Sequence, residues 1–175
     1  YFKGVVPEMM PAPDISLASD AQAAVDGFQK AMARYEFHKA AAAVWQFVSS
    51  MNKYIDVHEP WKLAKKEGNR PLLAAVICNL LEGLRTVACL IYPVMPGTSE
   101  KMLAALGMTL PGKGFFRLEQ IMPWGQVQPG TTLTRPPILF PRIDVPAADA
   151  SAAKTAPGKK KAGTVFSSEA KPVIT

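Results

Sequence analysis

The sequence predicts an all-α fold, a helix bundle that ends in an irregular C-terminal strap, and three observations lead to it. Apolar residues recur at spacings of three and four in several long segments, as on the buried face of a helix. Proline or glycine stands between these segments, where helices begin and end. Hydrophobic residues make up 49% of the 175 residues, which is enough for one domain with a substantial core.

The first two helices are predicted at about residues 20–34 and 36–57. The letters "SDAQ" have the form of a capping box, in which Ser19 and Gln22 satisfy each other's backbone amides. The apolar stripe of the first helix consists of Ala21, Ala24, Val25, Phe28, Ala31, Met32 and Tyr35. The stripe of the second consists of Phe37, Ala41, Val44, Trp45, Val48, Met51 and Ile55. This second stripe places Trp45 in the core.

Pro60 is predicted to end the second helix, because proline cannot sit in a helix interior and biases Glu59 away from helical geometry. Proline suits the first position of a new helix, so a short helix is predicted from Pro60 to Gly68. A long helix follows at about 70–92. Its stripe consists of Leu73, Val76, Ile77, Leu80, Leu84, Val87, Ala88 and Ile91. A last helix is predicted in "GTSEKMLAALG".

The chain changes character after this helix, because prolines interrupt residues 108–146 repeatedly. This segment is predicted to be an irregular strap that returns across the bundle and is held to it by Trp124. The folded domain is therefore predicted to span residues 1–146. Residues 147–175 are rich in Ala, Lys, Ser and Pro and have the composition of a flexible linker or tail.

No catalytic or metal-binding pattern is present in the sequence. A zinc cluster, a nucleophile elbow and a glycine-rich phosphate loop are all missing. Cys78 and Cys89 lie in one predicted helix about 16 Å apart. That is beyond the disulfide limit of about 7 Å, so both are predicted to be buried thiols of a reducing compartment. Asn79, Glu82 and Arg85 interrupt the apolar run, which predicts a buried helix and not a membrane span.

Positive charge is concentrated behind one tryptophan. The net charge is +6 and the pI about 9.4, which favours an anionic partner. Directly after Trp61, one acid stands among four cations: Lys62, Lys65, Lys66 and Arg70. An aromatic ring beside several cations is suited to unpaired nucleic acid, because the ring stacks on a base and the cations neutralise phosphates.

The residues alone leave two interpretations of this cluster open. Trp61 either packs into the bundle, as most tryptophans do, or projects from the helix end. A lysine run taken by itself is usually a solvated face. His58, in the turn before Pro60, is either structural or a contact residue.

The segment "NKYIDVHEPWKLAKKEG", the later "LRTVACLIYPVMP" and the closing "LFPRID" together resemble the anticodon-binding domain of bacterial methionyl-tRNA synthetases. The resemblance covers about residues 1–146. Its most specific parts are Asn52, Tyr54, the Pro60–Trp61 pair, Arg85 with the prolines that follow it, and the closing motif. The implied fold is the class I synthetase anticodon-binding bundle with its strap.

The resemblance implies that this domain reads the CAU anticodon of methionine and initiator tRNA. Trp61 matches the family tryptophan that stacks on the wobble-position cytosine, and Pro60 fixes that ring at the helix start. His58 is expected to bind the anticodon as well, because it neighbours this pair. The residues expected to contact phosphates are Lys62, Lys65, Lys66 and Arg70. The residues expected to be structural are Asn52, Tyr54 and Arg85.

The resemblance also implies a larger protein, a cytoplasmic methionine–tRNA ligase that uses ATP and Mg²⁺ and, in some members, Zn²⁺. The catalytic motifs of that family are missing here, as are the family's anticodon-binding Asn and Arg, so the chain is expected to bind without catalysis or cofactor. Its expected partners are these tRNAs and the catalytic domain of the same polypeptide, with no membrane. The tail either leads into an OB-fold tRNA-binding domain, which would give a homodimer, or is a plain basic terminus.

Two alternatives remain at this point. The chain could be the corresponding domain of the cysteinyl or isoleucyl synthetase, which competition between anticodons distinguishes. It could also be a helical protein-interaction module in which Trp61 anchors a protein. Salt titration separates that case, because nucleic-acid binding weakens steeply with salt and apolar docking does not.

Overall fold

The computed structural model describes residues 1–8, 16–108, 123–136 and 138–142, and in these residues it is helical, with one isolated β-bridge and no longer strand. The all-α prediction is therefore confirmed for the described part of the chain. Two compact units are present, Tyr1–Leu139 and Phe140–Thr175, and the fold below is that of the first. The predicted tail 147–175 and most of the first half of the predicted strap lie outside the described residues.

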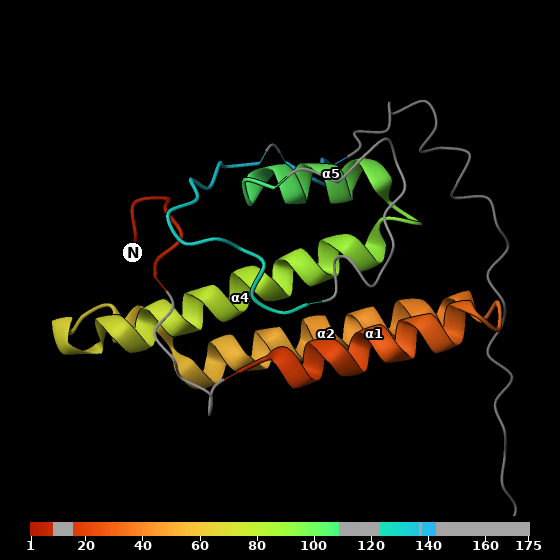
Figure 1. Cartoon of the computed structure of the whole chain (residues 1–175), viewed down its shortest axis with the longest axis horizontal. Helices are drawn as coiled ribbons and strands as arrows, with labels where there is room; N and C mark the ends of the chain where they lie inside the picture. The colour runs from red at the N-terminus through yellow and green to blue at the C-terminus, as the bar shows by residue number, and fades with distance from the viewer. Residues whose placement is uncertain (9–15, 109–122, 137, 143–175) are drawn as a thin grey trace, which may run out of the picture. The chain divides into compact units, whose positions relative to one another are not determined.

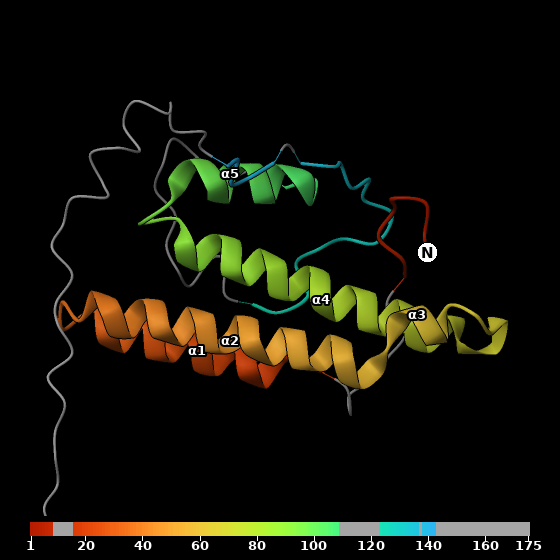
Figure 2. The ribbon, with the colours of Figure 1, turned by 180° about the vertical axis from the view of Figure 1, so that it is seen from behind.

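The helices form layers around one central helix. The elements are α1 (Ala18–Met32), α2 (Phe37–His58), α3 (Pro60–Leu63), the 3₁₀ turn η2 (Glu67–Asn69), α4 (Arg70–Ile91) and α5 (Pro96–Ala105). Figure 1 shows α4 in the middle, with the antiparallel pair α1 and α2 on one side and α5 on the other. Figure 2 shows the same order from behind.

The start of α1 differs from the prediction. Ser19 lies inside the helix, and no side chain caps it in the predicted manner. The backbone amide of Ala18 instead donates to Oγ of Ser16 at 3.1 Å, two residues earlier. Gln22 donates along the helix to Asp26 and does not turn back to the first turn. The helix therefore begins at Ala18, one residue before the predicted capping box.

The turn between α1 and α2 also corrects one predicted core residue. Tyr35 was placed on the first apolar stripe, but α1 ends at Met32 and Tyr35 takes a left-handed conformation with φ of 58°. Its side chain is 81% exposed. Helices α1 and α2 also approach each other closely at Gly27. A Cβ atom on Gly27 would lie only 3.3 Å from the Cβ of Ala43.

Helix α2 buries a face that overlaps only partly with the predicted stripe, because Val44 and Met51 are buried as predicted while Phe37 and Trp45 are exposed. Its buried residues are Ala40, Val44, Phe47, Met51 and Tyr54. The prediction that Trp45 lies in the core is wrong, because its side chain is 58% exposed. Val44 and Trp45 are adjacent and point about 100° apart on a helix, so α1 and α4 cover one of them and not the other. Trp45 instead borders an open apolar groove of 220 Å³.

Helix α4 is the core of the domain. Sixteen of its 22 residues are buried, on more than one face, as its neighbours on both sides require. Among the described residues, the segment Glu67–Ile91 is long and apolar enough to span a membrane by composition, and 72% of its apolar window is buried inside the protein. It is therefore a core helix, as predicted. Cys78 and Cys89 are free buried thiols, as predicted, and burial raises the pKa of both.

A buried ion pair on α4 holds the strap. Glu82 and Arg85 are each 2% exposed, and Nε of Arg85 lies 2.8 Å from a Glu82 carboxylate oxygen. The same guanidinium donates through Nη2 to the carbonyl of Pro123 at 3.0 Å, and the amide of Val127 donates to the other Glu82 oxygen. Trp124, between these two anchors, packs against the core. The predicted attachment of the strap by Trp124 is confirmed.

The strap then joins three parts of the domain. The amide of Val6 donates to the carbonyl of Thr131 at 2.9 Å, so the N-terminal segment pairs with the strap. The amide of Thr134 donates to the carbonyl of Ala105 at the end of α5 at 3.0 Å. Gly107, with φ of 72°, lets the strap approach, because a Cβ there would lie 2.4 Å from Cγ2 of Thr131.

We expect Arg85→Met to destabilise the fold by about 3–5 kcal/mol, because it leaves the Glu82 carboxylate buried without its cation. The matched control is Lys30→Met on the exposed side of α1, which should change stability by about 0.5 kcal/mol or less. Urea unfolding followed by circular dichroism measures both. Equal unfolding midpoints for the two variants would show that the pair does not hold the domain together.

Candidate nucleic-acid interface

The turn between α2 and α3 determines where Trp61 lies. Helix α2 ends at His58, as predicted, and Glu59 takes a left-handed conformation with φ of 42° and ψ of 60°. This conformation is uncommon for a residue other than glycine or asparagine. The Glu59 carbonyl accepts from the amides of Lys62 at 2.7 Å and Leu63 at 3.2 Å, which starts the new turn of helix.

The proline and the tryptophan of this turn face opposite ways. Pro60 is buried, while Trp61 directly after it is 44% exposed. The buried proline ring fixes the backbone, and the indole is left at the surface with roughly half of its area accessible. Of the two fates open to Trp61, the structure therefore shows the projecting one.

The cations near Trp61 fall into two groups. Lys65 and Lys66 are exposed, and within the described residues neither forms an ion pair. Lys62 is paired with Glu59 at 2.7 Å, with side chains 64% and 37% exposed. Arg70 lies over the ring of Phe2, 5.2 Å from its centroid. Two of the four predicted phosphate contacts are thus already engaged within the protein.

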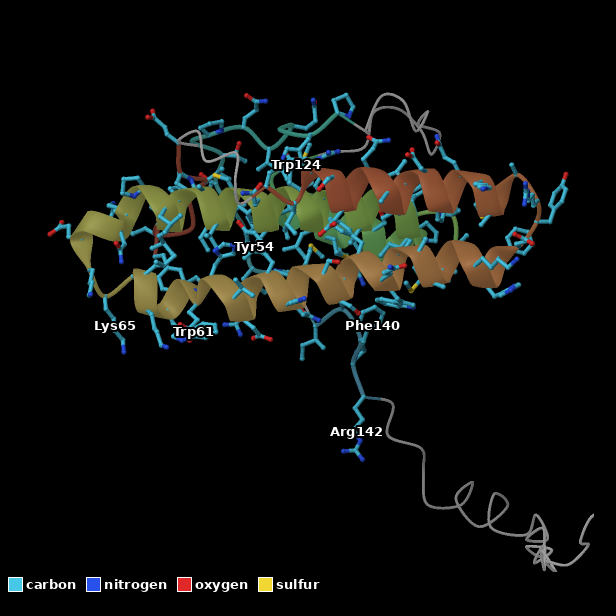
Figure 3. All side chains as sticks on the ribbon, turned by 90° about the horizontal axis from the view of Figure 1, so that it is seen from below. Tyr54, Trp61, Lys65, Trp124, Phe140 and Arg142 are labelled. Carbon is cyan, nitrogen blue, oxygen red and sulfur yellow. The ribbon has the colours of Figure 1, made fainter. Side chains whose placement is uncertain are left out.

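The short helix is shorter than predicted, which changes where the lysines lie. It ends at Leu63 and not at Gly68, because Lys66 takes an extended conformation with φ of −122°. Lys65 and Lys66 therefore lie in the connection between α3 and η2 and not on one helical face. Figure 3 shows Trp61 and Lys65 pointing outward on the same side of this end of the domain.

His58 belongs to a different hollow. Its ring lies 4.3 Å from that of Tyr54, with planes inclined at 54°. His58 and Tyr54 line a groove of 340 Å³ together with other residues of α2 and residues at the start of α1, and Trp61 is not among them. The lining residues are Ser16, Leu17, Asp20, Ser50, Lys53, Tyr54, Val57 and His58. Trp61 is therefore not part of the groove that His58 lines.

The three residues expected to be structural differ in burial. Tyr54 is 8% exposed and its hydroxyl accepts from Nδ2 of Asn79 at 3.3 Å. Burial raises the pKa of this hydroxyl above its ordinary value, and the hydrogen bond to Asn79 partly offsets the rise. Arg85 is buried in the ion pair with Glu82. Asn52 is exposed on α2, so its position does not support a structural role within this domain.

Two contacts of this region could not be read from the residue pattern. In the sequence, Glu59 is distinguished only by its position before a proline. In the structure it has the left-handed backbone conformation and forms the ion pair with Lys62. Phe2 lies far from Arg70 along the chain, and only the fold brings the two together. The available signal for Glu59 was its position two residues before the exposed indole.

The chain is similar to one protein family over most of its length. A family model described as the anticodon binding domain of methionyl tRNA ligase matches residues 7–159. A methionine–tRNA ligase of Caldanaerobacter subterraneus subsp. tengcongensis is 38% identical over 168 residues, which are 92% of this chain and 25% of that protein. One from Bacillus subtilis is 36% identical over 143 residues, 82% of this chain and 20% of that protein.

Solved structures show the same similarity. The apo crystal structure of Mycobacterium tuberculosis methionyl-tRNA synthetase superposes with a TM-score of 0.71 at 29% identity, over 82% of this chain and 29% of that one. The same enzyme bound by methionyl-adenylate gives a TM-score of 0.69 at 29% identity, over 79% of this chain and 27% of that one. The chain thus spans about a quarter of the length of these relatives.

We expect Tyr54→Phe to destabilise the domain by about 1 kcal/mol at neutral pH through loss of the hydrogen bond from Asn79. Because the folded-state pKa of Tyr54 is raised, the stability that the neutral hydroxyl provides is complete below about pH 10 and is lost as the pH rises through that pKa. Tyr35→Phe, on an exposed ring, is the control. Urea unfolding at neutral and alkaline pH measures the free energy of unfolding of wild type and Tyr54→Phe. The difference between the two free energies should become smaller as the pH rises. A difference that stays constant would contradict the raised pKa of Tyr54.

Proposed function

This chain belongs to the family of anticodon-binding domains of methionyl-tRNA ligase, and from that premise we propose that it recognises the CAU anticodon of methionine and initiator tRNA. The observation that supports this most directly is the exposed indole of Trp61 behind the buried ring of Pro60. The family model and the relatives favour the methionyl enzyme over the cysteinyl and isoleucyl alternatives.

The proposed central contact is stacking of the wobble cytosine on Trp61. An exposed indole offers its flat face to an unstacked base, a contact worth about 1–3 kcal/mol. Because α2 stops at His58 and α3 starts at Pro60, the backbone on both sides of the indole is held by helical hydrogen bonds. Little conformational entropy is then lost when the base binds, which favours recognition by a preformed platform.

The proposed phosphate contacts are Lys65 and Lys66 first, and Lys62 and Arg70 second. Lys65 and Lys66 are exposed and are not held by a carboxylate of the described residues, so they can approach a phosphate without breaking an ion pair. Lys62 would have to leave Glu59, or share its charge between two anions. Arg70 keeps its stacking contact with Phe2 and can still present its edge to RNA.

The remaining predicted residues take supporting roles in this proposal. Tyr54 and Arg85 support the bundle from within, the first under His58 and the second under the strap. His58 is proposed to contact the anticodon loop from its own groove and not together with Trp61. Asn52, being exposed, is proposed to be a contact residue of the longer protein or of the RNA.

The activity of the whole ligase is also a proposal for this chain. The longer protein would attach methionine to its tRNA with ATP and Mg²⁺ in the cytoplasm. The groups that hold ATP and metal are proposed to lie in the rest of the polypeptide. Among the described residues, no group of three His, Cys, Asp or Glu side chains could hold a metal ion. This chain contributes recognition, together with the catalytic domain and, where one follows the tail, an OB-fold domain.

We expect Trp61→Ala to weaken binding of an anticodon stem-loop RNA by about 1–3 kcal/mol, because the base loses its stacking surface. Trp45→Ala is the matched control, since Trp45 is also exposed, at 58% against 44% for Trp61, and lines an apolar groove that contains none of the four cations. Filter binding with the full-length protein measures both. Equal affinities for Trp61→Ala and wild type would remove stacking from the mechanism.

We expect Lys65→Gln and Lys66→Gln each to reduce the slope of log affinity against log salt by about 0.7, the value for one phosphate contact to single-stranded nucleic acid. Lys101→Gln, on the exposed side of α5, should leave the slope unchanged. Binding measured over a salt series gives the slopes. A shallow slope for the wild type itself would favour the protein-interaction module in place of RNA binding.

A further inference from the structure

Stacking alone leaves one question of the proposed function open, namely what makes the platform selective. Every base has a flat face, so an indole accepts cytosine and uracil with similar strength. Strong rejection of the wrong base requires a polar group that the wrong base leaves unsatisfied or repels. Such a group has to lie beside the ring and be fixed in position.

Glu59 is the residue of this turn that can supply such a group. It lies two residues before Trp61, at the start of the same short helix, and its side chain is 37% exposed. Its backbone is held by the left-handed conformation, by the buried Pro60 and by two hydrogen bonds from α3 to its carbonyl. Its side chain is held by the ion pair with Lys62 at 2.7 Å. A side chain restrained at both ends is a suitable reader of a base edge.

We propose, on the basis of the proposed function, that the Glu59 carboxylate reads the base stacked on Trp61 by accepting a hydrogen bond from its exocyclic amine and so selects cytosine over uracil. Cytosine presents an amino group at position 4, and a carboxylate is the side-chain group that accepts from it. Uracil presents a carbonyl oxygen there, which places two acceptors face to face. Uracil could offer its N3–H only by sliding across the ring, and the fixed backbone of Glu59 opposes that shift.

The ion pair with Lys62 explains how a carboxylate can stand on an RNA-binding surface. An isolated negative charge beside the phosphates would repel the RNA. The ammonium of Lys62 neutralises it and leaves the second carboxylate oxygen available, because the ion pair is made through Oε1. Lys62 is therefore the partner of the base-reading residue in this chain, and its contribution to phosphate binding is secondary.

The test compares anticodon stem-loop RNAs that carry CAU and UAU, bound to the full-length protein. Wild type should prefer CAU, and Glu59→Gln should reduce the ratio of the two affinities by about tenfold, because an amide can donate to uracil as well as accept from cytosine. Glu59→Ala should reduce the ratio as well. Thermal unfolding checks that both variants keep the fold.

Two controls separate this inference from simpler explanations. Glu67→Gln removes the same charge from an exposed residue of the following turn, η2, and should change both affinities equally without changing their ratio. Trp61→Ala should weaken both RNAs. If Glu59→Gln keeps the wild-type ratio while Trp61→Ala weakens binding, the base-reading role of Glu59 is wrong and stacking stands. If Trp61→Ala has no effect on either RNA, stacking is wrong, and if wild type does not prefer CAU over UAU, the proposed function itself is wrong.

Discussion

The buried ion pair between Glu82 and Arg85 is the interaction on which the rest of this domain depends. Two charges inside a protein are tolerated only when each is paired and its remaining hydrogen-bonding atoms are satisfied. Here the strap supplies those partners, the Pro123 carbonyl for Arg85 and the Val127 amide for Glu82. The central helix and a segment some 40 residues later in the chain therefore require each other, and the strap in turn holds the N-terminal segment and α5.

The turn that carries Trp61 is held in place by its packing against this interior. Helix α3 is only one turn long and could not hold its shape alone, since helix nucleation is unfavourable. It is held by burial of Pro60, by packing of Leu63 against the core and by the left-handed Glu59. An indole carried on such a turn has a defined direction before any ligand arrives. The conformation of Glu59 thus connects the packing of the bundle to the proposed recognition surface at its end.

The side chains around this turn differ in what they could offer to a ligand. Trp61 provides area, Lys65 and Lys66 provide charge that is not neutralised within the described residues, and Glu59 with Lys62 provides a polar group of fixed position. His58 lines a groove with Tyr54 that does not include Trp61. A cluster that looks uniformly basic in the sequence is therefore a set of distinct sites in space.

The sequence by itself determined the helices, their order and the helix break at Pro60, because periodicity and proline geometry act over a few residues. It also determined the tryptophan–lysine cluster and the family. The tertiary structure decided which apolar face each helix buries, since Val44 and Trp45 are equally apolar and only the positions of α1 and α4 choose between them. It likewise decided that Glu59 holds Lys62, that Arg70 meets Phe2 and that α3 ends early, because these depend on contacts and backbone angles that no local pattern encodes.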